Sequence, residues 1–233
     1  MSLKIHHPVG DVASGDGKQA YFSPYMDNGG STVAIAGEDY VIIATDTRLS
    51  AGFQILSREQ PKLFRLTKST VLGCSGCWCD ILTLTRLIEA RIKMYNHEHR
   101  KQMSTGAIAQ LLTTMLYQRR FFPYYVSNVL VGFDEEGKGI TYSYDPVGHC
   151  SKSTFVASGS SGALLQPLLD NQVGLKNLEG VQPVPVSKEK ALTLIKDTFV
   201  SAAERDIYTG DGILVNIISK DGIVEQTIPL RHD

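Results

Sequence analysis

The sequence has no excess of charge of either sign and no long hydrophobic run. Its 233 residues include 23 lysines and arginines against 24 aspartates and glutamates, a formal net charge of -1. It therefore lacks a basic field that could hold nucleic acid or an anionic membrane surface. No apolar run approaches the roughly 20 residues of a membrane span, and the N-terminus has no continuous apolar signal region. We expect no nucleic-acid or membrane partner, and a protein of the cytoplasm and nucleus.

Cysteine is scarce as well. Cys74, Cys77 and Cys79 lie close together in the stretch GCSGCWCD, and Cys150 stands alone. A zinc or iron-sulfur site would need a second ligand pair at matching spacing. The other interpretation is reduced, partly buried cysteines at a tight strand-to-helix turn, which also suits an intracellular compartment. We favour this second interpretation and expect neither a metal nor a cofactor.

Apolar residues are plentiful enough for a folded core. They make up 42% of the chain, and charged residues make up 20%, which suits a compact domain. Residues 1–21 are different, being poor in large apolar side chains and rich in Gly, Asp, Ser and Lys. We predict a flexible N-terminal tail or removable leader there, followed by a single domain over residues 22–233.

Hydrophobic periodicity predicts strands and helices in alternating groups. The predicted strands span residues 32–37, 40–46, 70–74, 126–133, 139–144, 212–219 and 222–230. The predicted helices cover residues 81–95, 108–116, 161–171 and 191–202. Ser104 and Ser187 are suitable N-caps for the second and fourth helices, and Pro167 fits the third only with a kink or within its first turns.

The order of these elements is strands, two helices, strands, two helices, strands. Helices grouped in pairs between hairpins cannot supply the single-helix crossovers of a parallel sheet. We therefore predict an α+β fold, a four-layer αββα sandwich of two antiparallel sheets flanked by helix pairs.

Several motifs accompany this order. GGSTVAIAG and ATDTR lie near the start and AERDIYTGDG near the end. Together with the element order they resemble the beta subunits of the proteasome core particle, in the N-terminal-nucleophile hydrolase superfamily. The resemblance runs from about Phe22 to Asp233 and includes FSPY, NGGSTVAIAGED, RRFFPYYV, DEEGKG, YDPVG and QPLLDNQVG. The order and joint presence of these motifs are similar to those of one particular subunit of the beta ring.

The resemblance implies where a nucleophile would lie. Active members use a threonine exposed as the new N-terminus, because a free α-amine with a pKa of roughly 7.7 to 8 can accept the proton of its hydroxyl. They also place an aspartate sixteen residues and a lysine thirty-two residues after that threonine. Counting back from Asp46 of ATDTR and from Lys62 of REQPK leads both times to Gly30. The position has no side chain, so we predict that the chain is not itself an enzyme.

Ser31 and Thr32 are the neighbouring hydroxyls that could replace the missing nucleophile. Successive strand residues point to opposite faces, so Ser31 should face away from the side that residue 30 would use. Thr32 faces the correct side but lies about 6.5 to 7 Å farther along the strand. Cleavage before either residue would leave Asp46 and Lys62 out of register. An active threonine or serine peptidase remains the first alternative, and a stand-alone binding module the second.

The rest of the family's site is matched by resemblance. Gly159-Ser160 matches a glycine-serine turn, and Asp206 matches the aspartate of an R-D-x-x-S-G segment in which Thr209 replaces the usual serine. Ser161 replaces a usual glycine, which we expect to cost backbone freedom. The constellation predicted to be vestigial consists of Gly30, Asp46, Lys62, Ser160, Asp206 and Thr209.

Each charged member also has a plain structural interpretation. Asp46 and Arg48 could form a turn hydrogen bond or an exposed ion pair. Lys62 could be a solvated side chain, and Asp206 could fold back onto backbone amides at a helix end. We favour such structural roles over catalysis. Our hypothesis is a buried polar network in which losing one partner leaves others unsatisfied, at about 1 to 3 kcal/mol each.

RRFFPYYV pairs two arginines with four aromatic residues, a composition found both in single-strand nucleic-acid grooves and at protein interfaces. The charge balance favours the interface.

The resemblance implies a seven-membered beta ring with two ring neighbours, an alpha ring and an opposite beta ring, which encloses a chamber for ubiquitin- and ATP-dependent protein degradation. It also implies that the subunit borders the substrate channel of an active neighbour of chymotrypsin-like preference. Asp145 in the DPVG turn is our candidate contact.

Overall fold

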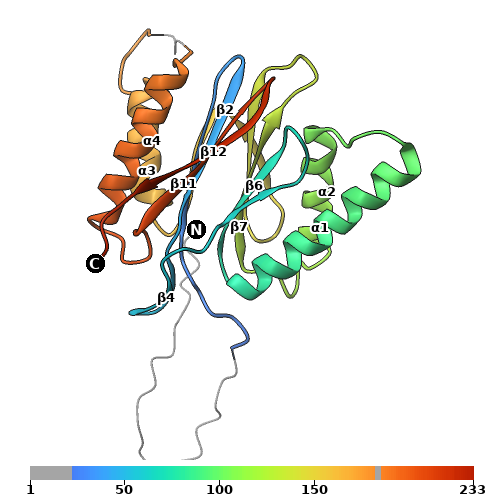
Figure 1. The fold of residues 1–233 in the computed structure, drawn as a ribbon, viewed down its shortest axis with the longest axis horizontal. Helices are drawn as coiled ribbons and strands as arrows, with labels where there is room; N and C mark the ends of the chain where they lie inside the picture. The colour runs from blue at the N-terminus through green and yellow to red at the C-terminus, as the bar shows by residue number, and fades with distance from the viewer. Residues whose placement is uncertain (1–22, 182–184) are drawn as a thin grey trace, which may run out of the picture.

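A computed structural model of the chain describes residues 23–181 and 185–233. Two five-stranded antiparallel sheets stack face to face, with α3 and α4 outside one sheet and α1 and α2 outside the other (Figure 1). This arrangement confirms the predicted four-layer sandwich. The predicted tail, residues 1–21, lies outside the described residues.

The first sheet contains, in spatial order, β10 (Phe155–Gly159), β1 (Ser31–Ala36), β2 (Tyr40–Asp46), β11 (Gly212–Ser219) and β12 (Gly222–Pro229). The second sheet contains β5 (Leu63–Arg65), β6 (Val71–Gly76), β7 (Val126–Phe133), β8 (Gly139–Tyr144) and β9 (Cys150–Ser153). A separate small hairpin, β3 (Leu49–Ala51) with β4 (Gln54–Ser57), projects below the sandwich in the view of Figure 1. The helices are α1 (Trp78–His99), α2 (Thr105–Tyr117), α3 (Gly162–Gln172) and α4 (Lys188–Ala203).

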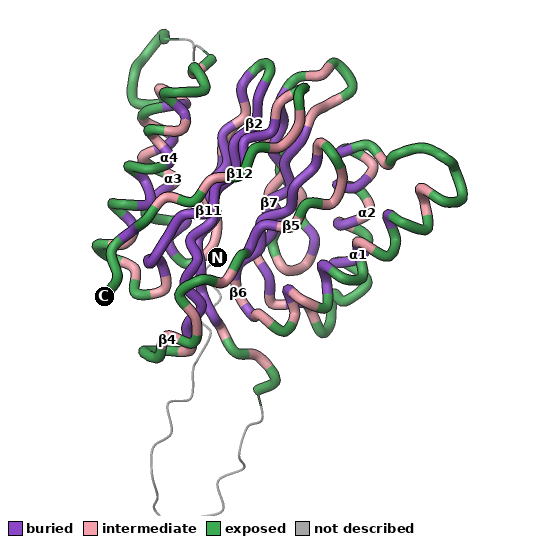
Figure 2. Tube along the Cα trace, in the orientation of Figure 1, coloured by how far each residue is buried: buried purple, intermediate pink, exposed green. Residues whose placement is uncertain are grey.

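Three apolar layers hold these elements together. Along β1, Val33 and Ile35 pack with the residues of α3 and α4, whereas Ala34 between them packs into the layer between the two sheets. This alternation follows from the period of two in a strand. A third layer fills the space between the second sheet and α1 and α2. Strands covered on both faces become buried along their length, as the purple centre of Figure 2 shows.

The predicted N-caps are both present. The Ser104 side chain accepts a hydrogen bond from the Ala107 N–H at 3.3 Å, and the Ser187 side chain accepts one from the Lys190 N–H at 3.4 Å. Pro167 lies inside α3, in its second turn. Helix α1 has 22 residues, about two turns more than predicted, because it begins three residues earlier, at Trp78, and runs to His99 past its last buried residue. Its own N-cap residue, Cys77, makes no side-chain cap.

Candidate functional site

Gly30 lies immediately before β1. Its carbonyl accepts a hydrogen bond from the Ser160 N–H at 2.9 Å, and its φ of +98° is rare for residues with a side chain. A Cβ at this position would lie 2.5 Å from Nζ of Lys62. The Lys62 ammonium group therefore takes up the space that a side chain at position 30 would need.

Lys62 and Asp46 form a buried ion pair between the two sheets. Asp46 is the last residue of β2, Lys62 directly precedes β5, and Nζ lies 2.7 Å from Oδ1. The Lys62 side chain is 1% exposed, so the solvated alternative is wrong. Asp46 also accepts the Ser31 N–H on Oδ1 at 2.8 Å and the Arg48 N–H on Oδ2 at 3.2 Å. Burial raises the pKa of the Asp46 carboxyl, and Lys62 and these two amides oppose that shift.

The Ser31 side chain lies on the opposite face of the strand, as predicted. Its Oγ is 2.5 Å from Oγ of Ser161 and 2.7 Å from Oγ1 of Thr209, and the residue is fully buried. Thr32 points between the sheets, close to Gly73, where a Cβ would lie 2.8 Å from its Cγ2. Its buried Oγ1 has no hydrogen-bond partner among the residues that the structure describes.

Asp206 accepts hydrogen bonds from a second group of hydroxyls. Its Oδ2 accepts hydrogen bonds from Ser160 Oγ at 2.6 Å and from Thr209 Oγ1 at 2.7 Å. Its Oδ1 accepts the Tyr208 N–H at 3.1 Å, which confirms the predicted fold-back onto a backbone amide. Because a hydroxyl has one proton and Thr209 donates it to Asp206, the Ser31 hydroxyl must be the donor toward Thr209.

The site residues matched by resemblance thus form one connected hydrogen-bond network. Ser31 joins its two halves, since its N–H bonds Asp46 and its hydroxyl bonds Thr209. This network runs from buried Lys62 to Ser160 at the surface. Sequence reasoning missed the joining role of Ser31, because the partners of its hydroxyl are more than 100 residues away along the chain.

The prediction that Ser161, in place of a usual glycine, costs backbone freedom is wrong. Its φ is -94°, a value open to any residue, so the substitution of the usual glycine causes no backbone strain. Gly159 has the left-handed conformation instead, with φ +89°, and a Cβ there would lie 2.1 Å from the Gly30 carbonyl oxygen. The glycine that the turn requires is therefore present, two residues earlier.

Asn28 is a further residue that sequence reasoning missed. It is buried, its Nδ2 donates to the Ser50 carbonyl at 2.9 Å, and its Oδ1 accepts the Trp78 N–H at 2.9 Å. An asparagine before two glycines is an ordinary turn signal, so the sequence offers no sign of these distant partners.

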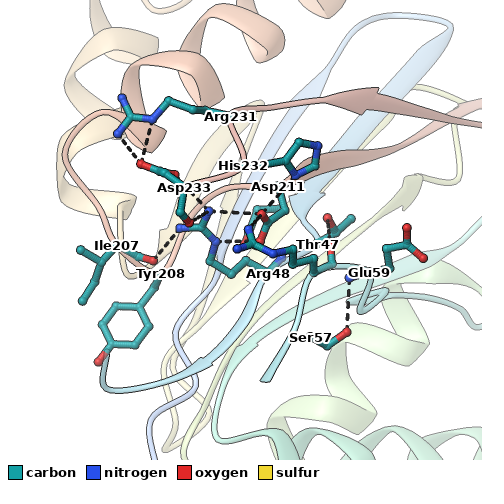
Figure 3. A network of polar contacts seen from close by, with 12 residues as sticks. Thr47, Arg48, Ser57, Glu59, Ile207, Tyr208, Asp211, Arg231, His232 and Asp233 are labelled. Atoms are coloured by element: carbon teal, nitrogen blue, oxygen red, sulfur yellow. Dashed lines mark hydrogen bonds and ion pairs between the residues drawn. The ribbon is translucent and has the colours of Figure 1, made fainter. Parts of the chain in front are cut away.

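Arg48 does not pair with Asp46 through its side chain. Its side chain is 5% exposed, and the guanidinium group lies between Asp211, whose Oδ2 it meets at 2.8 Å, and Asp233, whose Oδ1 it meets at 3.2 Å (Figure 3). It also donates to the Ile207 carbonyl at 3.1 Å. The exposed ion pair considered for Asp46 and Arg48 is therefore wrong, whereas the turn hydrogen bond from the Arg48 N–H is confirmed.

Asp211 at the centre of this network predicts a pH dependence. Burial raises the pKa of its carboxyl, but hydrogen bonds from Arg48 and Arg58 outweigh burial, and the net shift is downward. A depressed carboxyl pKa stabilises the fold above the unfolded value of about 3.9, and this stability is lost as the pH falls through the folded value. We expect Asp211→Asn to lose less stability than wild type between pH 5 and pH 2 in urea unfolding of the full chain. An unchanged pH dependence would contradict this role, and the exposed Asp221→Asn is the control.

Cys74, Cys77 and Cys79 lie at the junction of β6 and α1, as predicted, whereas Cys150 is the first residue of β9. Cys74 and Cys77 are buried, Cys79 is exposed, Cys150 is intermediate, and all four are free. Among the described residues, no group of three His, Cys, Asp or Glu could hold a metal ion. No helix in the described part of the chain is long and apolar enough to cross a membrane.

The four-layer sandwich, with this constellation around the residue before β1, defines the N-terminal-nucleophile hydrolase class of fold. The chain belongs to the proteasome subunit family, whose model, described as proteasome subunit, matches residues 26–218. It is 56% identical over 231 residues to proteasome subunit beta type-1 of Danio rerio, covering 99% of this chain and 95% of that protein. The protein of that name from Drosophila melanogaster is 58% identical over 218 residues, with 93% of each chain covered. The Arabidopsis thaliana protein of that name is 45% identical over 225 residues, covering 93% of this chain and 99% of the relative.

Proposed function

We propose that this chain is a non-catalytic beta subunit of the 20S proteasome core particle, which acts by holding its neighbours and enclosing the proteolytic chamber. One observation carries the proposal: Gly30 occupies the nucleophile position and the Lys62 ammonium group fills the space beside it. The residues that would support a nucleophile are engaged with one another, which supports our interpretation of the constellation as a vestigial, structural network.

We infer that the neighbouring hydroxyls, Ser31 and Thr32, do not replace the missing nucleophile. A nucleophile needs a hydroxyl and a base on the same side, within hydrogen-bond reach. The Ser31 hydroxyl is bonded to Ser161 and Thr209 on the face away from Lys62, and its N–H donates to Asp46, whereas the buried Thr32 hydroxyl has no hydrogen-bond partner among the described residues that could act as a base. These contacts disfavour the active-peptidase alternative.

A covalent probe for N-terminal nucleophiles tests this proposal in assembled core particles. We expect labelling of active beta subunits and none of this chain. Labelling at Ser31 or Thr32 would overturn the proposal and favour the peptidase alternative. Active neighbours in the same particle are the internal positive control.

Membership of the family implies assembly with other proteasome subunits. We infer two beta-ring neighbours, an alpha ring, an opposite beta ring and protein substrates in the chamber as the partners, in the cytoplasm and nucleus. The RRFFPYYV segment supports an interface: Phe121 is 98% exposed and Phe122 is 58% exposed, whereas Tyr124 is buried beneath Arg119. Large exposed aromatic side chains are typical of surfaces that become covered by a partner. A stable monomer of 25.6 kDa in native mass measurements would instead favour the stand-alone binding module.

Asp145 is proposed to contact substrate in the channel of the neighbouring active subunit. The residue is exposed, and its Oδ1 accepts the Val147 and His149 N–H groups at 3.0 and 2.8 Å, which fixes the turn. Its Oδ2 lies outside these turn hydrogen bonds and is the oxygen that we propose for substrate.

Replacing Asp145 with alanine is expected to change the relative cleavage rates of charged and apolar peptides by the neighbouring chymotrypsin-like subunit. The change should be about twofold to fivefold, because an exposed carboxylate contributes under about 1 kcal/mol. Asp145→Asn separates the charge from the turn, because its amide oxygen can keep the turn hydrogen bonds while an NH2 group replaces the charged Oδ2, and we expect it to change specificity as Asp145→Ala does. Unchanged specificity in assembled Asp145→Ala particles would remove the assignment.

A further inference from the structure

Residues 27–30, called the strap below, cross the end of β6 and the start of α1 before the chain enters β1. The Asn28 N–H donates to the Gly76 carbonyl at 3.2 Å, and the Gly76 N–H donates to the Gly29 carbonyl at 3.0 Å. Both backbone groups of Gly76 are therefore engaged by the strap.

Asn28 anchors the strap to two further elements. Its side chain bonds the Ser50 carbonyl on β3 and the Trp78 N–H at the start of α1, each at 2.9 Å. Helix α1 has no side-chain cap from its own N-cap residue, so Asn28 supplies the missing cap from fifty residues away in the sequence. One buried side chain thus ties two elements, β3 and α1, to the strap.

The glycines fix the path of the strap. Gly29 has φ +65°, and a Cβ there would lie 2.4 Å from Cβ of Tyr208. Its N–H is held by Oδ1 of Asp27 at 2.8 Å, which closes a local turn. The Gly30 carbonyl is bonded by Ser160. A segment with this many fixed contacts is ordered before any partner binds.

The backbone groups that the strap covers are those that a bound extended peptide would use. Exposed N–H and C=O groups at the end of a strand recruit a second extended segment by main-chain hydrogen bonding. Here Ser50, Gly76 and Trp78 offer such groups in one place, next to Gly30. The room that remains beside the strap is a cavity of about 290 Å³, and its lining includes Asp27, Gly29 and Ser160. Buried Ser75 also lines it, with an Oγ that has no partner in the described part of the chain.

We propose that the strap occupies this subunit's own peptide groove in cis, with Asn28 as its anchor. The inference rests on the proposed function and deepens it. Besides lacking a nucleophile, the subunit excludes extended polypeptides from the groove, so that chamber substrates and peptide-like inhibitors bind only at active neighbours. Releasing Asn28 should open the groove to an external peptide without creating a peptidase.

The test uses assembled core particles that contain the full chain as wild type, Asn28→Ala or Met26→Ala. Met26 is the matched control, because it lies one residue before the strap and is 57% exposed. Hydrogen–deuterium exchange of peptides covering Gly76 and Trp78 is expected to be slow in wild type and Met26→Ala. It should be roughly fivefold faster in Asn28→Ala, the effect expected for loss of one capping interaction.

The second readout is binding of a hexapeptide of alternating threonine and valine, blocked at both ends and carrying a benzophenone photo-crosslinker. We expect at least about fivefold more crosslinking near Ser50 and Gly76 in Asn28→Ala than in wild type or Met26→Ala, because the strap no longer competes for the same backbone groups. Equal crosslinking in all three proteins would overturn the proposal.

Further outcomes distinguish failure of the strap proposal from failure of the proposed function. If Asn28→Ala does not assemble, Asn28→Asp replaces it: the variant keeps the acceptor for Trp78 but places a carboxylate oxygen against the Ser50 carbonyl, and we expect the same faster exchange and stronger crosslinking. Fast exchange of the Gly76 and Trp78 amides in wild type overturns the strap without any variant. Labelling of this chain by the probe for N-terminal nucleophiles contradicts its non-catalytic role and says nothing against the strap, whereas equal crosslinking contradicts the strap alone.

Discussion

Lys62→Met is expected to lower the free energy of unfolding of the full chain by about 3 to 5 kcal/mol at neutral pH, measured by urea denaturation. The substitution keeps most of the side-chain volume and removes the ammonium group that lies 2.7 Å from Asp46. Asp46 is then left buried with two amide donors and no counter-charge, and breaking a buried pair from one side has a cost of this size. Because burial already raises the pKa of this carboxyl, we expect the loss to shrink as the pH falls and Asp46 takes up a proton.

Two comparisons isolate the pair. Asp46→Asn combined with Lys62→Met removes both charges and should cost clearly less than the sum of the single substitutions. Lys176→Met removes a lysine from a pair with Asp170 at 2.8 Å, where the lysine side chain is 64% exposed, and should cost under about 1 kcal/mol. A cost for Lys62→Met as small as that of Lys176→Met would contradict the structural role of the buried pair.

Gly30→Thr is expected to place a threonine at the nucleophile position without creating a peptidase. The new Cβ would meet Nζ of Lys62 at 2.5 Å, and the residue would sit at φ +98°. Relieving this contact must displace Lys62 or the strap, and either change breaks hydrogen bonds of buried groups. We expect a loss of stability of roughly 3 kcal/mol or more, since left-handed strain alone costs about 1 to 2 kcal/mol. Activity of the variant is measured with fluorogenic peptides in particles whose active subunits are blocked.

Gly137→Thr is the matched control for backbone strain. Gly137 also has a positive φ, +78°, but a Cβ there meets nothing within 4 Å. Gly137→Thr should therefore lose only the stability that a left-handed backbone conformation costs. The additional loss of stability in Gly30→Thr then measures the cost of the contact with Lys62. New peptidase activity in Gly30→Thr particles would show that the absent side chain is the whole cause of inactivity, contrary to our expectation of a site that is also closed by its surroundings.

The elements with strong local signals were predictable from the sequence. The β1–β2 hairpin, the paired helices and the capping serines follow from periodicity and side-chain chemistry within a few residues. Strands β3, β4, β5, β9 and β10 were not predicted. All five are short, and their strand conformation depends on pairing with other strands, such as β9 with β8 and β10 with β1, which local sequence does not report.

Some features of the candidate site could be predicted from the sequence, and others could not. The position of Gly30 could be found by counting from Asp46 and Lys62, because those spacings are fixed along the chain. The partners of Ser31 and Asn28 could not, since Thr209 and Trp78 are brought to them only by the packing of the finished fold. Burial of Lys62 agrees with the hypothesis of a buried polar network, but the sequence left the solvated alternative open, because a lysine is ordinarily exposed and its counter-charge comes from the other sheet.

Mass analysis of the chain purified from its native assembly, after treatment with a covalent probe for N-terminal nucleophiles, tests the central claim most directly. It reports the N-terminal residue, the adduct and the co-purifying chains in one experiment. We predict an unlabelled chain in which the bond between Gly30 and Ser31 is intact, recovered together with other proteasome subunits. A chain that begins at Ser31 or Thr32 and carries the probe would contradict the claim that this subunit is non-catalytic.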